Sequence, residues 1–228
     1  MSGLFVTGTD TGCGKTAVAC ALARAARAEG LRVRVLKPVE TGCEAGPNGE
    51  LVPADALALA RAAGDDAPLE RICPYQLKLP VAPELAAADE GVTIEVARLE
   101  KAYAVASSDA DGVIVEGAGG LRVPLAPGLE MGDLALRLDL PLLVVCRARL
   151  GTLNHTLLTL EAAERRGLRI AGVVVSHTEP DLSAADRANL AHLLDRLPAP
   201  CLGELAHGAE AVAPPLDLAA LLSPSDTR

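Results

Sequence analysis

Short apolar segments alternate along this chain with longer segments rich in alanine and leucine. The apolar segments cover residues 4–8, 32–39, 112–117, 141–146 and 169–176, and the helical patterns cover 16–28, 55–63, 94–107, 153–166 and 183–196. Continuous apolar strands separated by helices are typical of a mostly parallel sheet that is buried on both faces. The sequence therefore predicts an α/β fold with helices on both faces of the sheet.

The domain organisation follows from the length and from the absence of a linker. A chain of 228 residues can bury a sizeable core in one domain without metals or disulfides. We predict one domain over residues 1–222 and a frayed tail at 223–228. Within the domain, the Gly- and Pro-rich segment 42–53 is predicted to be a loop.

Composition and charge exclude several classes of protein. Half of the residues are hydrophobic, which excludes a disordered chain, and the net charge of -9 disfavours binding to nucleic acid or to anionic membranes. The N-terminus lacks the pattern of a signal peptide, and no apolar run is long enough to span a membrane. The six cysteines form no CxxC pair, which excludes a zinc site of that spacing. We expect a cytoplasmic protein with reduced thiols.

A glycine-rich loop separates the first predicted strand from the first predicted helix. The segment from Gly8 to Thr16 reads GTDTGCGKT and resembles a Walker A loop, with the leading glycine one residue further out than usual. Its backbone N–H groups can approach phosphate oxygens, Lys15 can reach the β- and γ-phosphates, and the Thr16 hydroxyl can bind Mg²⁺. The alternative is a glycine-rich turn with an incidental lysine. The order of strand, loop and helix favours a P-loop NTPase-like fold.

Three further residues are candidates for the same site. Lys37, one of only four lysines, is predicted at the C-terminal end of a strand, where open α/β sheets bind their ligands. Glu116 follows the apolar run GVIV at the C-terminal end of a predicted strand, where an acid in a nucleotide-binding fold is a candidate Mg²⁺ ligand. The glycines after it allow the backbone to pass close to a ligand. Asp55 follows Pro53 at the start of a predicted helix, and the residues alone favour an ordinary helix cap over a metal ligand. A solvated Lys37 and a Glu116 that merely caps a turn are the alternatives.

Several blocks of the sequence together resemble the dethiobiotin synthetase family. They are FVTGTDTGCGKT (5–16), KPVETG (37–42), DALALAR (55–61), VEGAGG (115–120), RLGTLNHTLLTL (149–160) and PAPCLGE (198–204). The resemblance implies a homodimeric enzyme. It would close the ureido ring of dethiobiotin from 7,8-diaminononanoate, CO2 and ATP with Mg²⁺. It also implies a carbamate intermediate and then a carbamic–phosphoric anhydride.

The resemblance also implies roles for individual residues. Catalytic roles fall on Lys15 and Lys37, and Mg²⁺ binding falls on Thr16, Asp55 and Glu116. The diamine would contact Thr41 and, across the dimer interface, Gly151, Thr152, Leu153 and Asn154. ATP would contact Gly12, Cys13, Gly14, Lys15, Thr16, Ala17, Asp55, Glu116, Gly117, Ala118, Gly119, Ser176, His177, Ala206, His207 and Gly208.

The chain departs from the family pattern in two places. Gly12 stands where some members carry an acid, and Ser176-His177 stand where some carry an Asn-Asp pair that reads adenine. An alternative function is a regulatory ATPase of the partitioning or cell-division class. Those proteins place a second lysine near the start of the loop, where this chain has Asp10.

Overall fold

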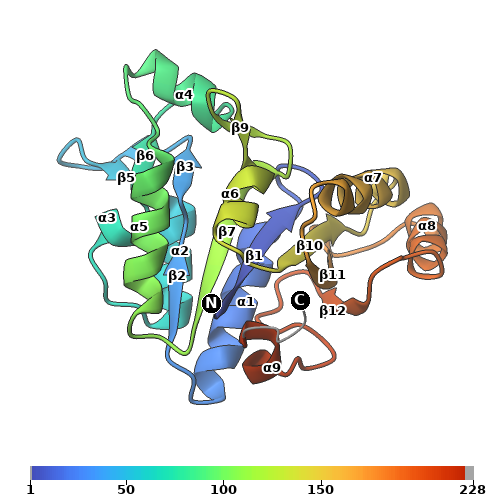
Figure 1. The fold of residues 1–228 in the computed structure, drawn as a ribbon. Helices are drawn as coiled ribbons and strands as arrows, with labels where there is room; N and C mark the ends of the chain where they lie inside the picture. The colour runs from blue at the N-terminus through green and yellow to red at the C-terminus, as the bar shows by residue number, and fades with distance from the viewer. Residues whose placement is uncertain (1, 224–228) are drawn as a thin grey trace.

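A six-stranded parallel sheet forms the centre of the molecule. The computed structural model describes residues 2–223. Every neighbouring pair of strands in the sheet is parallel. The order across the sheet is β12 (Cys201–Leu205), β11 (Ile170–Ser176), β10 (Leu142–Arg147), β1 (Gly3–Gly8), β7 (Gly112–Gly120) and β2 (Val33–Leu36) (Figure 1).

Helices cover both faces of this sheet, as predicted. The side chains of Leu4 and Val6 pack with α1 (Lys15–Ala28), α2 (Ala54–Ala63) and α9 (Leu218–Leu222). The opposite face of the sheet is covered by α5 (Val96–Ser107), α6 (Met131–Arg137), α7 (Thr152–Arg165) and α8 (Ala184–Leu194). Alternate residues of one strand therefore enter different cores, which explains why the strands are apolar throughout.

The predicted strand 32–39 is wrong in one respect, because it is divided at Lys37-Pro38. Proline has no N–H to donate to a sheet, and the chain leaves the main sheet after β2. It then forms β3 (Val39–Thr41), which pairs with β6 (Tyr75–Leu77) in a separate sheet. Lys37 lies at this break, where its backbone N–H bonds to the carbonyl oxygen of Ile72 at 2.8 Å.

The remaining elements are short. The predicted loop 42–53 contains a small hairpin of β4 (Glu44–Ala45) and β5 (Leu51–Val52). The five-residue strand β12 was not predicted from the sequence. The other short elements are α3 (Leu69–Ile72), α4 (Pro83–Asp89), β8 (Pro124–Ala126) and β9 (Leu129–Glu130).

Residues 224–228 of the predicted frayed tail lie outside the described residues. Within residues 2–223, none of the helices combines the length and the apolar character that crossing a bilayer requires.

Candidate active site

The loop between β1 and α1 is built to receive an anion. Gly14 is the N-cap of α1 with a φ of 94°, and no side chain caps this helix. The first N–H groups of α1 are therefore left for a ligand. A Cβ on Gly14 would lie 2.1 Å from Oγ of Ser176, and one on Gly8 would lie 2.5 Å from Sγ of Cys13. A side chain at either position would have to displace these neighbours, and the positive φ of Gly14 also favours glycine.

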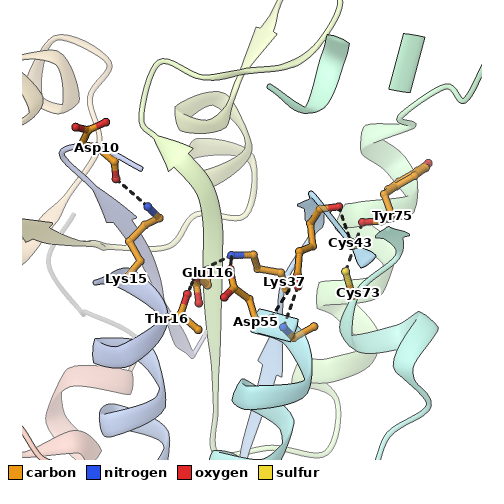
Figure 2. Close-up of polar contacts among 11 residues, drawn as sticks. Asp10, Lys15, Thr16, Lys37, Cys43, Asp55, Cys73, Tyr75 and Glu116 are labelled. Carbon is orange, nitrogen blue, oxygen red and sulfur yellow. Dashed lines mark hydrogen bonds and ion pairs between the residues drawn. The ribbon is translucent and has the colours of Figure 1, made fainter. Parts of the chain in front are cut away.

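Lys15 and Cys13 take different positions around this loop. The Lys15 ammonium donates to the carbonyl oxygen of Asp10 at 3.0 Å, so it reaches back over the loop (Figure 2). The Cys13 side chain is fully buried, and its thiol donates to the carbonyl oxygen of Val145 at 3.4 Å. Cys13 thus faces the core, and its backbone is the part that a nucleotide could contact.

Lys37 lies at the centre of a buried charged cluster. Its ammonium is 2.6 Å from Oε1 of Glu116 and 2.8 Å from Oδ2 of Asp55 (Figure 2). The Thr16 hydroxyl donates to the same Glu116 oxygen at 2.8 Å. These residues come from α1, α2, β7 and the segment after β2, so the fold brings together all four residues that the sequence singled out here. A solvated Lys37 and a turn-capping Glu116 are both wrong, because the side chains are 4% and 0% exposed.

The charges in this cluster stabilise one another. Burial on its own would lower the pKa of Lys37, but the carboxylates of Glu116 and Asp55 outweigh burial and raise that pKa above its ordinary value. Burial on its own would raise the pKa of Asp55, but the Lys37 ammonium lowers it below its ordinary value. Both groups are therefore charged at neutral pH.

The interpretation of Asp55 as an ordinary helix cap is wrong. The N-cap of α2 is Pro53, which supplies no side-chain bond, and Asp55 lies inside the first turn. The cap comes from Glu40 of β3, whose two carboxylate oxygens accept the backbone N–H groups of Asp55 and Ala56, each at 2.9 Å. Asp55 is consequently free to use its carboxylate in the cluster.

A cavity of about 570 Å³ opens beside this cluster. It is bounded by most of the residues predicted around the phosphates and by Thr41, but Gly117 does not line it and instead packs against Phe5 and Met131. Two parts of the lining were not predicted: Glu40, and residues 80–83, which lead into α4. Glu40 belonged to the KPVETG block, whereas no motif marked residues 80–83. The lining residues are Thr11, Gly12, Gly14, Lys15, Thr16, Lys37, Val39, Glu40, Thr41, Asp55, Pro80, Val81, Ala82, Pro83, Glu116, Ala118, Gly119 and Val123.

A second cavity, of about 510 Å³, shares Gly14 and Thr16 with the first. Six further residues predicted to contact ATP line it: Ala17, Ser176, His177, Ala206, His207 and Gly208. The fold thus places Ser176 and His177, which stand at the adenine-reading positions of the family, next to the predicted phosphate loop.

The residues at the start of α7 that are predicted to contact the diamine line neither of these two cavities of their own chain. Gly151 caps α7 with a φ of 95°, Thr152 is buried, and Asn154 is exposed. His155, one residue further along, lines a separate cavity with Thr9 and Arg122.

The donor atoms of the site fit Mg²⁺. Within residues 2–223, no three His, Cys, Asp or Glu side chains gather into a metal site. The site instead offers the Thr16 hydroxyl and the carboxylates of Asp55 and Glu116, and Oε2 of Glu116 is buried without a hydrogen-bond partner among these residues. Mg²⁺ prefers such a set, one or two carboxylates completed by water and substrate phosphates.

Comparison of the fold with solved structures identifies its type. The chain matches MinD, a cell division protein of Aquifex aeolicus, with a TM-score of 0.53 and 13% identity over 92% of this chain and 84% of that chain. It matches the signal recognition particle receptor FtsY of Elizabethkingia anophelis with a TM-score of 0.53 and 17% identity over 97% of this chain. The chain spans 62% of that FtsY. These matches confirm the predicted P-loop NTPase fold.

Comparison of the sequence with known families is more specific. A family model described as an AAA domain matches residues 2–214. The ATP-dependent dethiobiotin synthetase BioD of Anaeromyxobacter dehalogenans is 52% identical over 84% of this chain and 86% of its own length. Those of Aromatoleum aromaticum and Pseudomonas paraeruginosa are 47% and 45% identical, over 91% and 96% of this chain and 91% and 97% of their own lengths. The chain therefore belongs to the dethiobiotin synthetase family.

Proposed function

We propose that this chain is an ATP- and Mg²⁺-dependent enzyme that converts 7,8-diaminononanoate and CO2 into dethiobiotin, ADP and phosphate. The observation that carries the proposal is the convergence of Lys15, Lys37, Thr16, Asp55 and Glu116 on one cavity. Two cations, a hydroxyl and two carboxylates suit phosphoryl transfer with a divalent metal. The identity of 45–52% to dethiobiotin synthetases supports this particular reaction and disfavours a regulatory ATPase.

The proposed reaction has three steps. One amine of the substrate adds to CO2 and forms a carbamate. The carbamate oxygen then attacks the γ-phosphorus, ADP leaves, and a carbamic–phosphoric anhydride remains. The second amine attacks the carbonyl carbon, phosphate leaves with its electron pair, and the ureido ring closes as the amines release their protons.

The residues of the site act mainly through charge and position. Lys15 and Lys37 lie where they can neutralise the phosphoryl oxygens, and the N–H groups of α1 can bind the phosphates. Thr16, Asp55 and Glu116 would hold Mg²⁺, which would neutralise phosphate charge when bound. Thr41 on the cavity wall is positioned to contact the diamine.

A direct assay tests the proposed function. The protein is incubated with ATP, Mg²⁺, ¹³C-bicarbonate and 7,8-diaminononanoate, and the products are analysed by mass spectrometry. We expect dethiobiotin that carries one ¹³C atom, and ADP in equal amount. ATP hydrolysis that is independent of the diamine and responds to DNA or to vesicles would instead support a regulatory ATPase.

We also propose that the active enzyme is a cytoplasmic homodimer. Gly151–Asn154 do not line the phosphate-side cavity of their own chain, and in a dimer they could complete the partner's diamine site. Two leucines near this segment are exposed: Leu150, just before α7, is 70% exposed, and Leu158, on α7, is 55% exposed. A second subunit packed against this segment would remove both side chains from water.

We propose that the enzyme discriminates weakly between nucleoside triphosphates. The Ser176 side chain is buried against Gly14, and His177 is paired with Glu204 at 2.5 Å. Neither has the separate carbonyl oxygen and NH2 group with which an amide can make two simultaneous hydrogen bonds to adenine. We expect GTP and CTP to support turnover. A preference for ATP in kcat/KM above about a thousandfold, or about 4 kcal/mol, would contradict this.

A further inference from the structure

Helix α2 carries a candidate metal ligand but cannot cap its own N-terminus. Its first internal bond runs from the N–H of Leu57 to the carbonyl oxygen of Pro53 at 3.0 Å. The N–H groups of the preceding residues have no partner within the helix. Helices usually solve this with a Ser, Thr, Asp or Asn at the N-cap, whereas here the N-cap is a proline.

Glu40 satisfies two of these N–H groups from another part of the chain. Its oxygens accept the N–H groups of Asp55 and Ala56, each at 2.9 Å. Glu40 is only 7% exposed. A buried carboxylate is an expensive way to cap a helix, so capping alone is a poor explanation for its presence.

The same short segment holds Asp55 at two points. Lys37, three residues before Glu40, bonds to the Asp55 carboxylate at 2.8 Å. Glu40 bonds to the Asp55 backbone. A cation bound to the Asp55 carboxylate would compete with Lys37 for its negative charge. The bond from Glu40 uses the backbone of Asp55 and is compatible with such a cation.

We propose that Glu40 is a positioning residue that holds the start of α2 so that Asp55 presents its carboxylate to a divalent cation. This inference rests on the proposed role of Asp55 as a Mg²⁺ ligand. Residues that orient a metal ligand through hydrogen bonds typically change metal affinity by about 10- to 100-fold when they are replaced.

The test measures metal binding without turnover. Mn²⁺ is titrated into the protein by electron paramagnetic resonance in the presence of the non-hydrolysable β,γ-imido analogue of ATP. We expect Glu40→Ala, which loses both bonds, to raise the Kd for Mn²⁺ by about tenfold. Glu40→Gln keeps one accepting oxygen and should give a smaller increase. Hydrogen exchange of the peptide that contains Asp55 and Ala56 should accelerate in the same order.

Ser183→Ala is the matched control. Ser183 caps α8 by accepting the N–H of Asp186 at 3.1 Å, and it does not line either of the two cavities at the site. This variant should lose stability as a cap variant does, while its Kd for Mn²⁺ stays unchanged. If Glu40→Ala likewise lowers Tm but leaves that Kd within twofold of the parent value, Glu40 is only a cap and the proposal is refuted.

Two further outcomes are separable. If Glu40→Ala does not fold, Glu40→Gln decides alone: an unchanged Kd refutes the proposal and an increased Kd supports it. The binding assay contains no diamine, so it does not depend on the proposed reaction. The parent protein could form no dethiobiotin while the Glu40 variants still show the graded loss of Mn²⁺ binding. That result would refute the proposed function and leave the role of Glu40 supported.

Discussion

Replacing Lys37 by methionine removes the positive charge from the centre of the buried cluster and keeps most of the side-chain volume. Glu116, which is 0% exposed, then loses its cationic partner, while Asp55 stays 43% exposed and can be solvated. Removing one partner of a buried ion pair typically costs about 3–5 kcal/mol. In a domain of this size, that corresponds to a fall in Tm of about 6–20 °C.

Catalysis should suffer separately from stability. A well-placed group that stabilises charge in a transition state contributes about 2.7–4 kcal/mol, so kcat should fall by about 10²- to 10³-fold. The assay is thermal unfolding of the ligand-free protein, followed by product formation well below the Tm of the variant. Lys101→Met, which changes an exposed lysine on α5, is the matched control and should alter neither quantity.

A second substitution identifies the cause of the instability. Glu116→Gln removes the carboxylate that Lys37→Met leaves unpaired, so the double variant should be more stable than the sum of the two single losses predicts. A Tm of Lys37→Met within about 2 °C of the parent, where a loss of 1 kcal/mol already shifts Tm by about 2–4 °C, would refute the charge argument. Near-normal product formation would refute the catalytic role.

Three other predictions follow from the structure. Burial acts to raise the pKa of Asp55 but Lys37 lowers it below 3.8, so the folded protein binds fewer protons there than the unfolded chain. The stability that this pairing contributes is present above the ordinary pKa of an aspartate and is lost as the pH falls through the lowered pKa. Urea unfolding between pH 6 and pH 3 should therefore show a smaller loss of stability for Asp55→Asn than for the parent. Five cysteines are buried and Cys201 is exposed, so Ellman's reagent should label one thiol quickly in the folded protein and all six in denaturant; fast labelling of a second thiol would contradict the buried assignments. Leu158→Arg should convert the proposed dimer into a monomer in light scattering while the far-UV circular dichroism of the folded parent is kept, and a parent protein that is both monomeric and fully active would exclude the dimer.

The sequence alone predicted five of the six strands of the central sheet, the helices on its faces and the glycine-rich loop. These features depend on residues that are neighbours along the chain. The apolar strands pack into cores on both faces, and the glycines from Gly8 to Gly14 precede the helix that begins at Lys15. Local patterns of this kind are read directly from hydrophobic periodicity and from the positions of glycine.

The tertiary structure decided what the charged residues do. Lys37 and Glu116 are 79 residues apart in sequence, and Glu40 and Asp55 are 15 apart. From its neighbours alone Asp55 is an ordinary start of a helix, and only the approach of β3 shows that Glu40 takes over the cap. Likewise, β12 forms a strand by pairing with β11. A hydrogen bond or ion pair between distant segments has a geometry that is fixed by packing, and no pattern of adjacent residues encodes it.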